Sequence, residues 1–312
     1  MKKIKKLSLI LLTSISLSVP AAAAEPALGE PVLLAETSGE TETPKQPVKN
    51  GWNTLANGKR QFLKNGVPVT GIRKISGKTF CFDKKGYLVC GRWYTKDNKK
   101  YRTDKSGSPV TGLKKIGGKT YYFNSKGVMQ TGTVTLKKVT YYFKDNGQLE
   151  ARKSGSKYYD ANGKQMNSVK ANQFETLQRA KGIVKKITTS KMTKQEKLKK
   201  CFDWVVSKPY VTRRRFSNTQ GWPAVYANDH FVLGGGNCFS DAAAFAYLAK
   251  ALGYTKVYVC VDSDGRGGSG HSWAEVNGLV YDPLFAEAKG YSKNYGVRYG
   301  VYVLHPILHI AI

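Results

Sequence analysis

The sequence predicts a multidomain protein in which an all-β solenoid of hairpin repeats is followed by an α+β domain. Between residues 51 and 169 a glycine recurs about every twenty positions, and an aromatic residue stands four positions before nearly every one. From residue 170 onward the repeat stops, and apolar positions follow first a helical and then a strand period. Four segments are therefore expected: 1–24, 25–50, 51–169 and 170–312.

The first segment, 1–24, predicts a secretory signal peptide. Four lysines among its first six residues form the charged start, the run 7–19 is the apolar centre, and Ala22 and Ala24 mark the cleavage site. That run is too short for a membrane span. Residues 25–50 hold glutamates among proline, threonine and serine without periodicity, which predicts a flexible linker.

The charge is strongly basic. The formal net charge is +30, of which the signal peptide supplies only four lysines, so the exported chain needs anionic surroundings. For an exported protein, the expected partner is an anionic cell wall, with teichoic acid or peptidoglycan as its polymers, or an anionic phospholipid surface. A nucleic-acid binder would also explain the charge, but the chain offers no recognition motif and export argues against it.

The repeats of 51–169 predict stacked hairpins. The clearest copy is GGKTYYFNSKGVMQTG, at 117–132. One such hairpin is too small to be stable alone, so successive copies must stack. The turn glycines are Gly66, Gly86, Gly107, Gly127, Gly147 and Gly163.

The chain has five cysteines, Cys81, Cys90, Cys201, Cys238 and Cys260. A two-residue turn at Lys85-Gly86 would place Cys81 directly opposite Cys90, and export permits the disulfide that this geometry predicts. Cys201 and Cys260 stand at apolar positions and are expected in the core. The odd number leaves a free thiol, for which Cys238 is the natural candidate.

Residues 171–208 predict two amphipathic helices that open the second domain. Thr193 and Glu196 form the pattern of a capping box, and Pro209 ends the second helix. The run Arg213-Arg214-Arg215 that follows either contacts phosphates or an acidic substrate, or is a solvated loop.

Cys238 follows three glycines and begins a stretch, 238–252, that lacks glycine and proline and is apolar on nearly all sides. This predicts a helix buried in a core, stopped by Gly253. A cysteine at a helix N-terminus favours the thiolate, which attacks carbonyl carbons. The alternative is a buried structural cysteine.

Asn277-Gly278 predicts a two-residue hairpin turn between strands 272–276 and 279–281. In that register Trp273 faces Asp282, and His271 lies on the same face. His271 and Asp282 are then diagonal neighbours roughly 7–8 Å apart at the backbone, which suits a carboxylate that holds an imidazole by one hydrogen bond. With Cys238 they complete the residue types of nucleophilic thiol catalysis.

No metal or cofactor is expected. The loop 262–270 resembles a calcium loop, but Trp273 stands where an EF-hand needs a glutamate, so we expect a mobile loop beside the active site. Neither His230, His305 nor His309 has cysteines or acids near it in the sequence that would suggest a metal site.

From about residue 172 to 312 the sequence resembles the transglutaminase-like superfamily. The motif consists of Gly236, Cys238, Leu252-Gly253-Tyr254, His271, Trp273 and Asp282-Pro283. The resemblance implies a papain-like core with Cys238 as nucleophile, His271 as base and then acid, and Asp282 orienting His271. It implies a protein or peptide substrate, with water or an amine as acceptor. The backbone amide of Cys238 and the side chain of Trp222 are candidates for stabilising the oxyanion.

The repeats are similar to choline-binding-type cell-wall modules of Gram-positive surface proteins. That resemblance implies aromatic cages that hold a quaternary ammonium, with Trp52, Trp93, Tyr121 and Tyr141 as candidate walls. Most copies lack the tryptophan, so weak or absent choline binding is expected, with wall polymers held partly by charge. Alternatively, the tyrosines simply pack the solenoid.

Together these expectations describe a secreted, cell-wall-associated thiol acyltransferase or hydrolase at a bacterial surface. Two alternatives stay open: a cysteine peptidase that trims wall peptides, and a catalytically silent adhesin.

Overall fold

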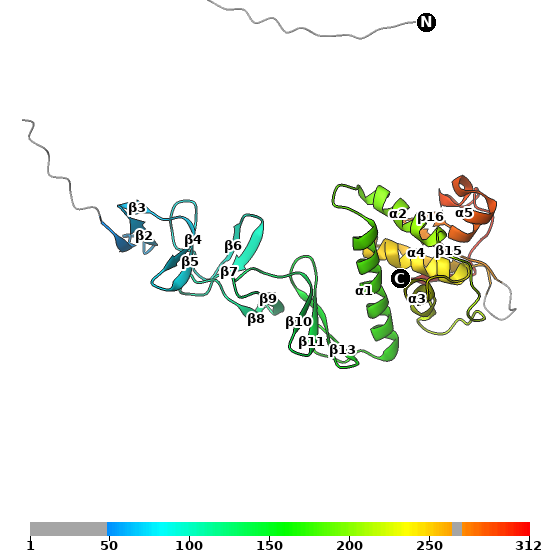
Figure 1. Cartoon of the computed structure of the whole chain (residues 1–312), viewed down its shortest axis with the longest axis horizontal. Helices are drawn as coiled ribbons and strands as arrows, with labels where there is room; N and C mark the ends of the chain where they lie inside the picture. Colours follow the sequence, from blue (N-terminus) through cyan, green and yellow to red (C-terminus); the bar gives the residue numbers. More distant parts are fainter. Residues whose placement is uncertain (1–48, 264–269) are drawn as a thin grey trace, which may run out of the picture. The chain divides into compact units, whose positions relative to one another are not determined.

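Short antiparallel hairpins build the first half of the described chain (Figure 1). The computed structural model describes residues 49–263 and 270–312, so the expected signal peptide and nearly all of the expected linker lie outside it. The strands are β1 Gly51–Thr54, β2 Arg60–Lys64, β3 Val67–Pro68, β4 Gly71–Ile75, β5 Lys78–Phe82, β6 Trp93–Lys96, β7 Lys99–Arg102, β8 Gly112–Ile116, β9 Lys119–Phe123, β10 Gly132–Leu136, β11 Val139–Phe143, β12 Leu149–Ser154 and β13 Lys157–Asp160. The predicted all-β repeat region is confirmed.

Each recurring glycine lies in the turn after a hairpin, and the hairpin's own turn falls earlier. The β4–β5 hairpin turns at 76–77, whereas Gly86 belongs to the next turn. In that turn the carboxylate of Asp83 accepts hydrogen bonds from the backbone N–H groups of Lys85 (2.9 Å) and Tyr87 (2.8 Å). An aspartate that closes a turn on its own backbone is a common turn device.

The turn that contains Gly86 also determines which residue lies across from Cys81. The predicted disulfide is not formed, because Cys81 and Cys90 are free thiols, one buried and the other exposed. A single bridge pairs Phe82 with Leu88, and the N–H of Val89 donates to the carbonyl of Cys81 (2.8 Å). The residue across from Cys81 is therefore Val89, one position short of the prediction, because the turn is longer than two residues.

Contact between successive copies explains the spacing of about twenty residues. A Cβ atom placed on Gly127 would lie 2.5 Å from Cβ of Pro109 in the preceding copy, and Gly86 stands in the same relation to Pro68. Both glycines have positive φ. Only glycine meets both demands without strain. The turns at Gly86 and Gly127 are therefore seated on the copy before them.

The second half combines helices with one antiparallel sheet (Figure 1). The sheet has the strand order β17-β16-β15-β14-β18. The elements are α1 Ser168–Ile187, α2 Lys194–Val206, α3 Trp222–Leu233, α4 Cys238–Ala251, β14 Val257–Val261, β15 Ser272–Val276, β16 Leu279–Tyr281, α5 Pro283–Lys289, η1 Tyr291–Lys293, β17 Tyr295–Val297 and β18 Leu308–Ala311. In the part of the chain that the structure describes, no helix is long and apolar enough to cross a membrane.

Helix α4 is the centre of the second core. All residues from Cys238 to Ala249 are buried, and α4 contacts α1, α2, α3 and the strands β14 and β15. Alanines on most sides allow these elements to approach α4 closely. The prediction of a buried helix is confirmed, and Gly253, with φ +82°, follows its C-terminal cap. The capping box of Thr193 and Glu196 is present at the start of α2.

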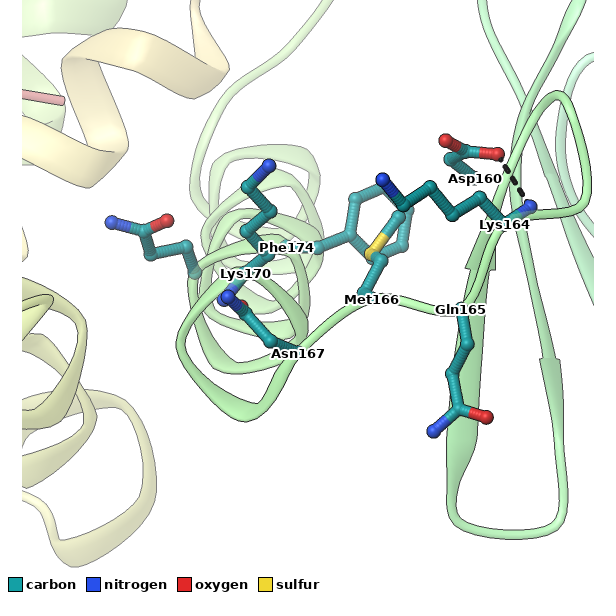
Figure 2. Close-up of a pocket in the computed structure, with 8 residues that line it drawn as sticks. Asp160, Lys164, Gln165, Met166, Asn167, Lys170 and Phe174 are labelled. Carbon is teal, nitrogen blue, oxygen red and sulfur yellow. Dashed lines mark hydrogen bonds between the residues drawn. The ribbon is translucent and has the colours of Figure 1, made fainter.

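The last hairpin copy packs on the first turns of α1. The ring of Phe174 meets the rings of Tyr142 (5.1 Å between centroids) and Tyr158 (5.9 Å). Beside it lies a cavity of about 530 Å³, lined by residues from the end of β13 through α1, including Asp160 and Lys170 (Figure 2). None of the three predicted catalytic residues lines this cavity.

Candidate active site

Cys238 is the first residue of α4 and lies in the core rather than on the surface. Asn237 caps the helix, its side-chain oxygen accepting from the N–H of Ser240 (3.3 Å). The Cys238 side chain is buried, and its Sγ lies 3.9 Å from the carbonyl oxygen of Gly270. The loop that precedes β15 therefore brings its backbone to the thiol.

Burial controls the ionisation of this thiol. It raises the pKa of Cys238 to about 12, the carboxylates of Asp241 and Asp282 act in the same direction, and the backbone N–H of Ser272 acts against them. The sequence led us to expect that the helix N-terminus would favour a thiolate. Here desolvation exceeds that effect, so the neutral thiol is the resting form at neutral pH.

His271 and Asp282 meet as the hairpin register predicts. Strands β15 and β16 pair Val276 with Leu279 across the turn, which carries His271 and Asp282 to the same end of the pair. His271 Nε2 lies 2.6 Å from Asp282 Oδ2. Because Nε2 is taken by the carboxylate, Nδ1 is the ring nitrogen that can exchange a proton with a thiol.

Asp282 is held by more than the imidazole. The hydroxyl of Tyr302 donates to the same Oδ2 atom (2.7 Å), and the N–H of Phe285 donates to Oδ1 (3.0 Å), so Asp282 also caps α5. Its side chain is fully buried. Burial and the neighbouring Asp282 carboxylate raise the pKa of Tyr302, which keeps its hydroxyl protonated as a donor. Nothing in the sequence indicated Tyr302. The capping role of Asp282 could have been predicted, because Asp-Pro is a recognisable helix start.

The imidazole of His271 is fixed on two further sides. The ring of Phe285 stacks on it with centroids 3.9 Å apart, and Trp273 lies 6.4 Å away at a similar tilt. The backbone N–H of His271 donates to the carboxylate of Asp262. These contacts restrict the ring to one orientation, as an acid–base residue requires. The expected mobile loop at 262–270 lies largely outside the described residues, because 264–269 are not described.

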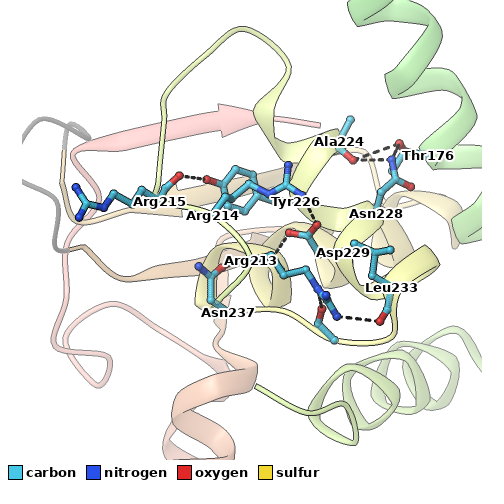
Figure 3. Close-up of polar contacts among 12 residues, drawn as sticks. Thr176, Arg213, Arg214, Arg215, Ala224, Tyr226, Asn228, Asp229, Leu233 and Asn237 are labelled. Carbon is cyan, nitrogen blue, oxygen red and sulfur yellow. Dashed lines mark hydrogen bonds and ion pairs between the residues drawn. The ribbon is translucent and has the colours of Figure 1, made fainter. Parts of the chain in front are cut away.

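The arginine run anchors the glycine loop before Cys238 (Figure 3). Arg213 donates to the carbonyls of Gly235 (2.9 Å) and Leu233 (2.9 Å). Arg214 lies 2.6 Å from the buried carboxylate of Asp229, whose other oxygen accepts from Ser240 on α4 (2.9 Å). The sequence left two alternatives for this run, contact with phosphates or an acidic substrate and a solvated loop. Neither describes Arg213 and Arg214, because both bond to groups within the domain.

Two further buried groups lie near the thiol. His230 on α3 pairs through Nε2 with Asp241, one turn beyond Cys238 on α4, while His230 Nδ1 is buried with no hydrogen-bond partner among the described residues. Burial raises the pKa of Asp241. Within the same described residues the indole N–H of Trp222 is also buried without a partner, and its ring packs on Phe239, the neighbour of Cys238. The sequence had no signal for the His230–Asp241 pair.

The four candidate cage residues fall into different surroundings. The rings of Trp93 and Tyr121, from successive copies, have centroids 5.1 Å apart. Together with Met129 and Lys100 they line a cavity of about 270 Å³. The ring of Trp52 is instead covered by Arg60, whose guanidinium lies 4.4 Å from the ring centroid. Tyr141 stacks on Phe143 at 6.3 Å. Of the four candidates, Trp93 and Tyr121 thus line a cavity together.

Two family models match the chain, in the order that the motifs predict. Residues 110–154 match the choline-binding repeat, and residues 181–289 match the transglutaminase-like superfamily. The second match includes Cys238, His271 and Asp282. The matched segments are thus similar to a choline-binding repeat and, further along the chain, to the transglutaminase-like superfamily.

Solved structures with similar repeats include choline binding protein F from Streptococcus pneumoniae in the presence of a peptidoglycan analogue. It has 28% identity and a TM-score of 0.32, and the match covers 38% of this chain and 40% of that one. A multimodular pneumococcal cell wall endolysin from phage Cp-1, complexed with choline, has 27% identity and a TM-score of 0.31, with 41% and 40% covered. The chain thus spans less than half the length of these proteins. A search of the curated proteins found no match.

Proposed function

We propose that this protein is a wall-associated cysteine acyltransferase or hydrolase that uses Cys238, His271 and Asp282. The observation that carries the proposal is the 2.6 Å contact between His271 and Asp282, together with the contact of Gly270, the residue before His271, with the Cys238 thiol. A buried carboxylate that fixes an imidazole, in a segment whose backbone contacts a thiol, has the parts that nucleophilic catalysis requires.

The reaction begins from the neutral thiol. His271 takes the thiol proton through Nδ1 as sulfur attacks the carbonyl carbon of a carboxamide or peptide bond, and Asp282 stabilises the imidazolium. The tetrahedral intermediate collapses when His271 returns the proton to the leaving nitrogen, which departs as ammonia or an amine and leaves a thioester. Water or an amine then attacks the thioester, His271 removes its proton, and the thiol is released.

Two donors are candidates for stabilising the oxyanion. The backbone N–H of Cys238 lies in the first turn of α4, where helix N–H groups have no intrahelical acceptor. The indole N–H of Trp222 has no partner in the described structure, which supports its availability. A buried donor without a hydrogen bond destabilises the folded state, so its presence calls for an explanation. Stabilisation of an oxyanion is such an explanation.

The test is release of ammonia from glutaminyl peptides, with and without a primary amine, comparing the wild type with Cys238→Ala. Cys238-dependent ammonia with amine incorporation establishes acyl transfer, and ammonia alone establishes deamidation. Cys238-dependent cleavage of wall peptides without ammonia establishes the peptidase. Absence of all three activities overturns the proposal in favour of a silent adhesin.

For the repeats we propose weak binding of a quaternary ammonium at the cavity of Trp93, Tyr121 and Met129. Two aromatic faces attract such a cation, but the ammonium of Lys100 lines the same cavity and opposes it. The strongly basic surface adds attraction to anionic wall polymers, which supports a place at the bacterial cell surface after export.

A choline column tests this second proposal. We expect weak retention that Trp93→Ala abolishes and that Trp52→Ala leaves unchanged, because Arg60 already covers Trp52. Tight retention that survives high salt and persists in Trp93→Ala would contradict it.

A further inference from the structure

The outer face of the sheet gathers a cysteine, a glutamate and a histidine from three adjacent strands. Cys260 on β14 is paired directly with His309 on β18, and on the other side with Trp273 on β15. Glu275 lies two residues beyond Trp273, so its side chain emerges on the same face as theirs. His309 has no cysteine or acid near it in the sequence, but strand pairing brings both beside it in space.

The ligand atoms of these residues are close together. One atom from each of Cys260, Glu275 and His309 lies within 4.8 Å of the other two. His309 Nε2 stands 3.1 Å from Glu275 Oε2. The hydroxyl of Tyr299 donates to the same Oε2 atom (3.1 Å) and lies 3.8 Å from Cys260 Sγ. A fourth possible ligand atom, the Tyr299 hydroxyl oxygen, is thus present beside the three.

Burial grades from the interior to the surface. Cys260 is fully buried, and the side chain of Glu275 is 13% exposed while that of His309 is 42% exposed. An ion can therefore reach the cluster past His309, and the thiol lies at its inner end. The cluster therefore differs from an ion pair on the surface, because its sulfur atom is buried in the fold.

Neighbouring side chains orient the group. The ring of Tyr258 stacks on the His309 imidazole with centroids 4.0 Å apart. The indole N–H of Trp273 donates to the Tyr299 hydroxyl (3.1 Å). Aromatic and hydrogen-bonding partners that fix the direction of ligand side chains are typical of metal sites.

We propose that Cys260, Glu275 and His309 bind a divalent transition-metal cation, with zinc as the best fit. Zinc takes thiolate, imidazole and carboxylate ligands in a tetrahedral arrangement, with Tyr299 oxygen or a water molecule in the fourth position. Binding releases the thiol proton of Cys260 to solvent, and the ion replaces that proton on sulfur. The metal then joins β18, near the end of the chain, to β14 and β15.

Cobalt(II) is the probe, because it occupies zinc sites and absorbs light through thiolate ligation. The full chain without a polyhistidine tag carries Cys90→Ala and Cys238→Ala, which remove the exposed thiol and the proposed nucleophile. We expect one cobalt ion per chain, with a sulfur-to-cobalt absorption band that zinc displaces. Cys260→Ser should abolish the band, and Glu275→Gln should weaken cobalt binding at least tenfold.

Matched variants separate the site from adventitious binding. His309→Gln changes a half-exposed residue and leaves the core intact, so its expected loss of at least tenfold in affinity cannot be attributed to misfolding. Cys201→Ser and His305→Gln, outside the cluster, should bind cobalt as before. Absence of the band, or equal binding in His309→Gln and its parent, overturns the proposal.

Discussion

The hydroxyl of Tyr302 donates to the same carboxylate oxygen of Asp282 that holds His271. The two donors approach Oδ2 at 2.7 and 2.6 Å, while the side chain of Asp282 is cut off from water. The hydroxyl therefore stabilises the carboxylate form and fixes its direction. Tyr302 acts on the proposed chemistry as a positioning residue, through Asp282.

Tyr302→Phe removes this donor and keeps the ring. A hydrogen bond to a charged group contributes about 1.5–3 kcal/mol, so we expect activity to fall roughly tenfold or more, with the fall in kcat rather than in KM. Tyr291→Phe is the matched control, because its hydroxyl donates to Asp203 (2.6 Å), which is not part of the candidate site. Equal losses of activity in both variants would show a general effect on stability instead.

The reactivity of Cys238 should depend steeply on pH. Because burial raises its pKa to about 12, the thiol stays protonated through neutral pH and its thiolate fraction grows as the pH rises. Alkylation by iodoacetamide, followed by peptide mass spectrometry, should therefore accelerate from pH 7 to beyond pH 9. Exposed Cys90 serves as an internal reference. A Cys238 rate that is already maximal at pH 7 would indicate a preformed thiolate.

Arg214→Gln should disturb the glycine loop that precedes Cys238, whereas Arg215→Gln should not. Asp229 is buried and loses its charged partner in the first variant, at a cost of about 2–3 kcal/mol. Arg215 joins the described network through its carbonyl, which accepts from Tyr226 (2.8 Å). Urea unfolding and activity measured on both variants test this. The same unfolding midpoint for both would contradict the anchoring role.

Gly127→Ala should weaken the repeats more than Gly132→Ala. Both positions have positive φ, which costs an alanine about 1–2 kcal/mol. At Gly127 the new methyl group also meets Pro109, which adds about 1–3 kcal/mol, whereas no atom lies within 4 Å at Gly132. Circular dichroism during urea unfolding measures the difference. Equal losses would show that the seating of the turn on the preceding copy contributes nothing.

Local patterns predicted the parts of the site that depend on local geometry. The turn Asn277-Gly278 sets the register of a whole hairpin, so the meeting of His271 with Asp282 followed from a few residues. Tyr302 could not be predicted in this way, because it reaches Asp282 from an irregular segment twenty residues away. Helix α3 was missed because it starts at Gly221-Trp222-Pro223, which in sequence looks like a loop.

Pairing between distant strands was the other limit. Cys260 and His309 are almost fifty residues apart, and only the crossover that lays β18 against β14 makes them neighbours. The predicted pairing of the two cysteines in the repeats was wrong for a different reason. They are close in the sequence, but the turn between them is longer than the two residues assumed. One residue of slip replaced Cys90 by Val89 across from Cys81.

The seating of turn glycines such as Gly86 and Gly127 on the preceding copy also bears on how such a chain can change in evolution. When contacts run only between adjacent units, duplication or loss of one whole unit leaves every remaining junction intact. The interval from Gly86 to Gly107 is one residue longer than the intervals on either side of it, yet a Cβ atom on Gly107 would still meet Leu88 of the preceding copy. The number of copies is thus free to vary, and a junction tolerates a one-residue change in the length of a copy.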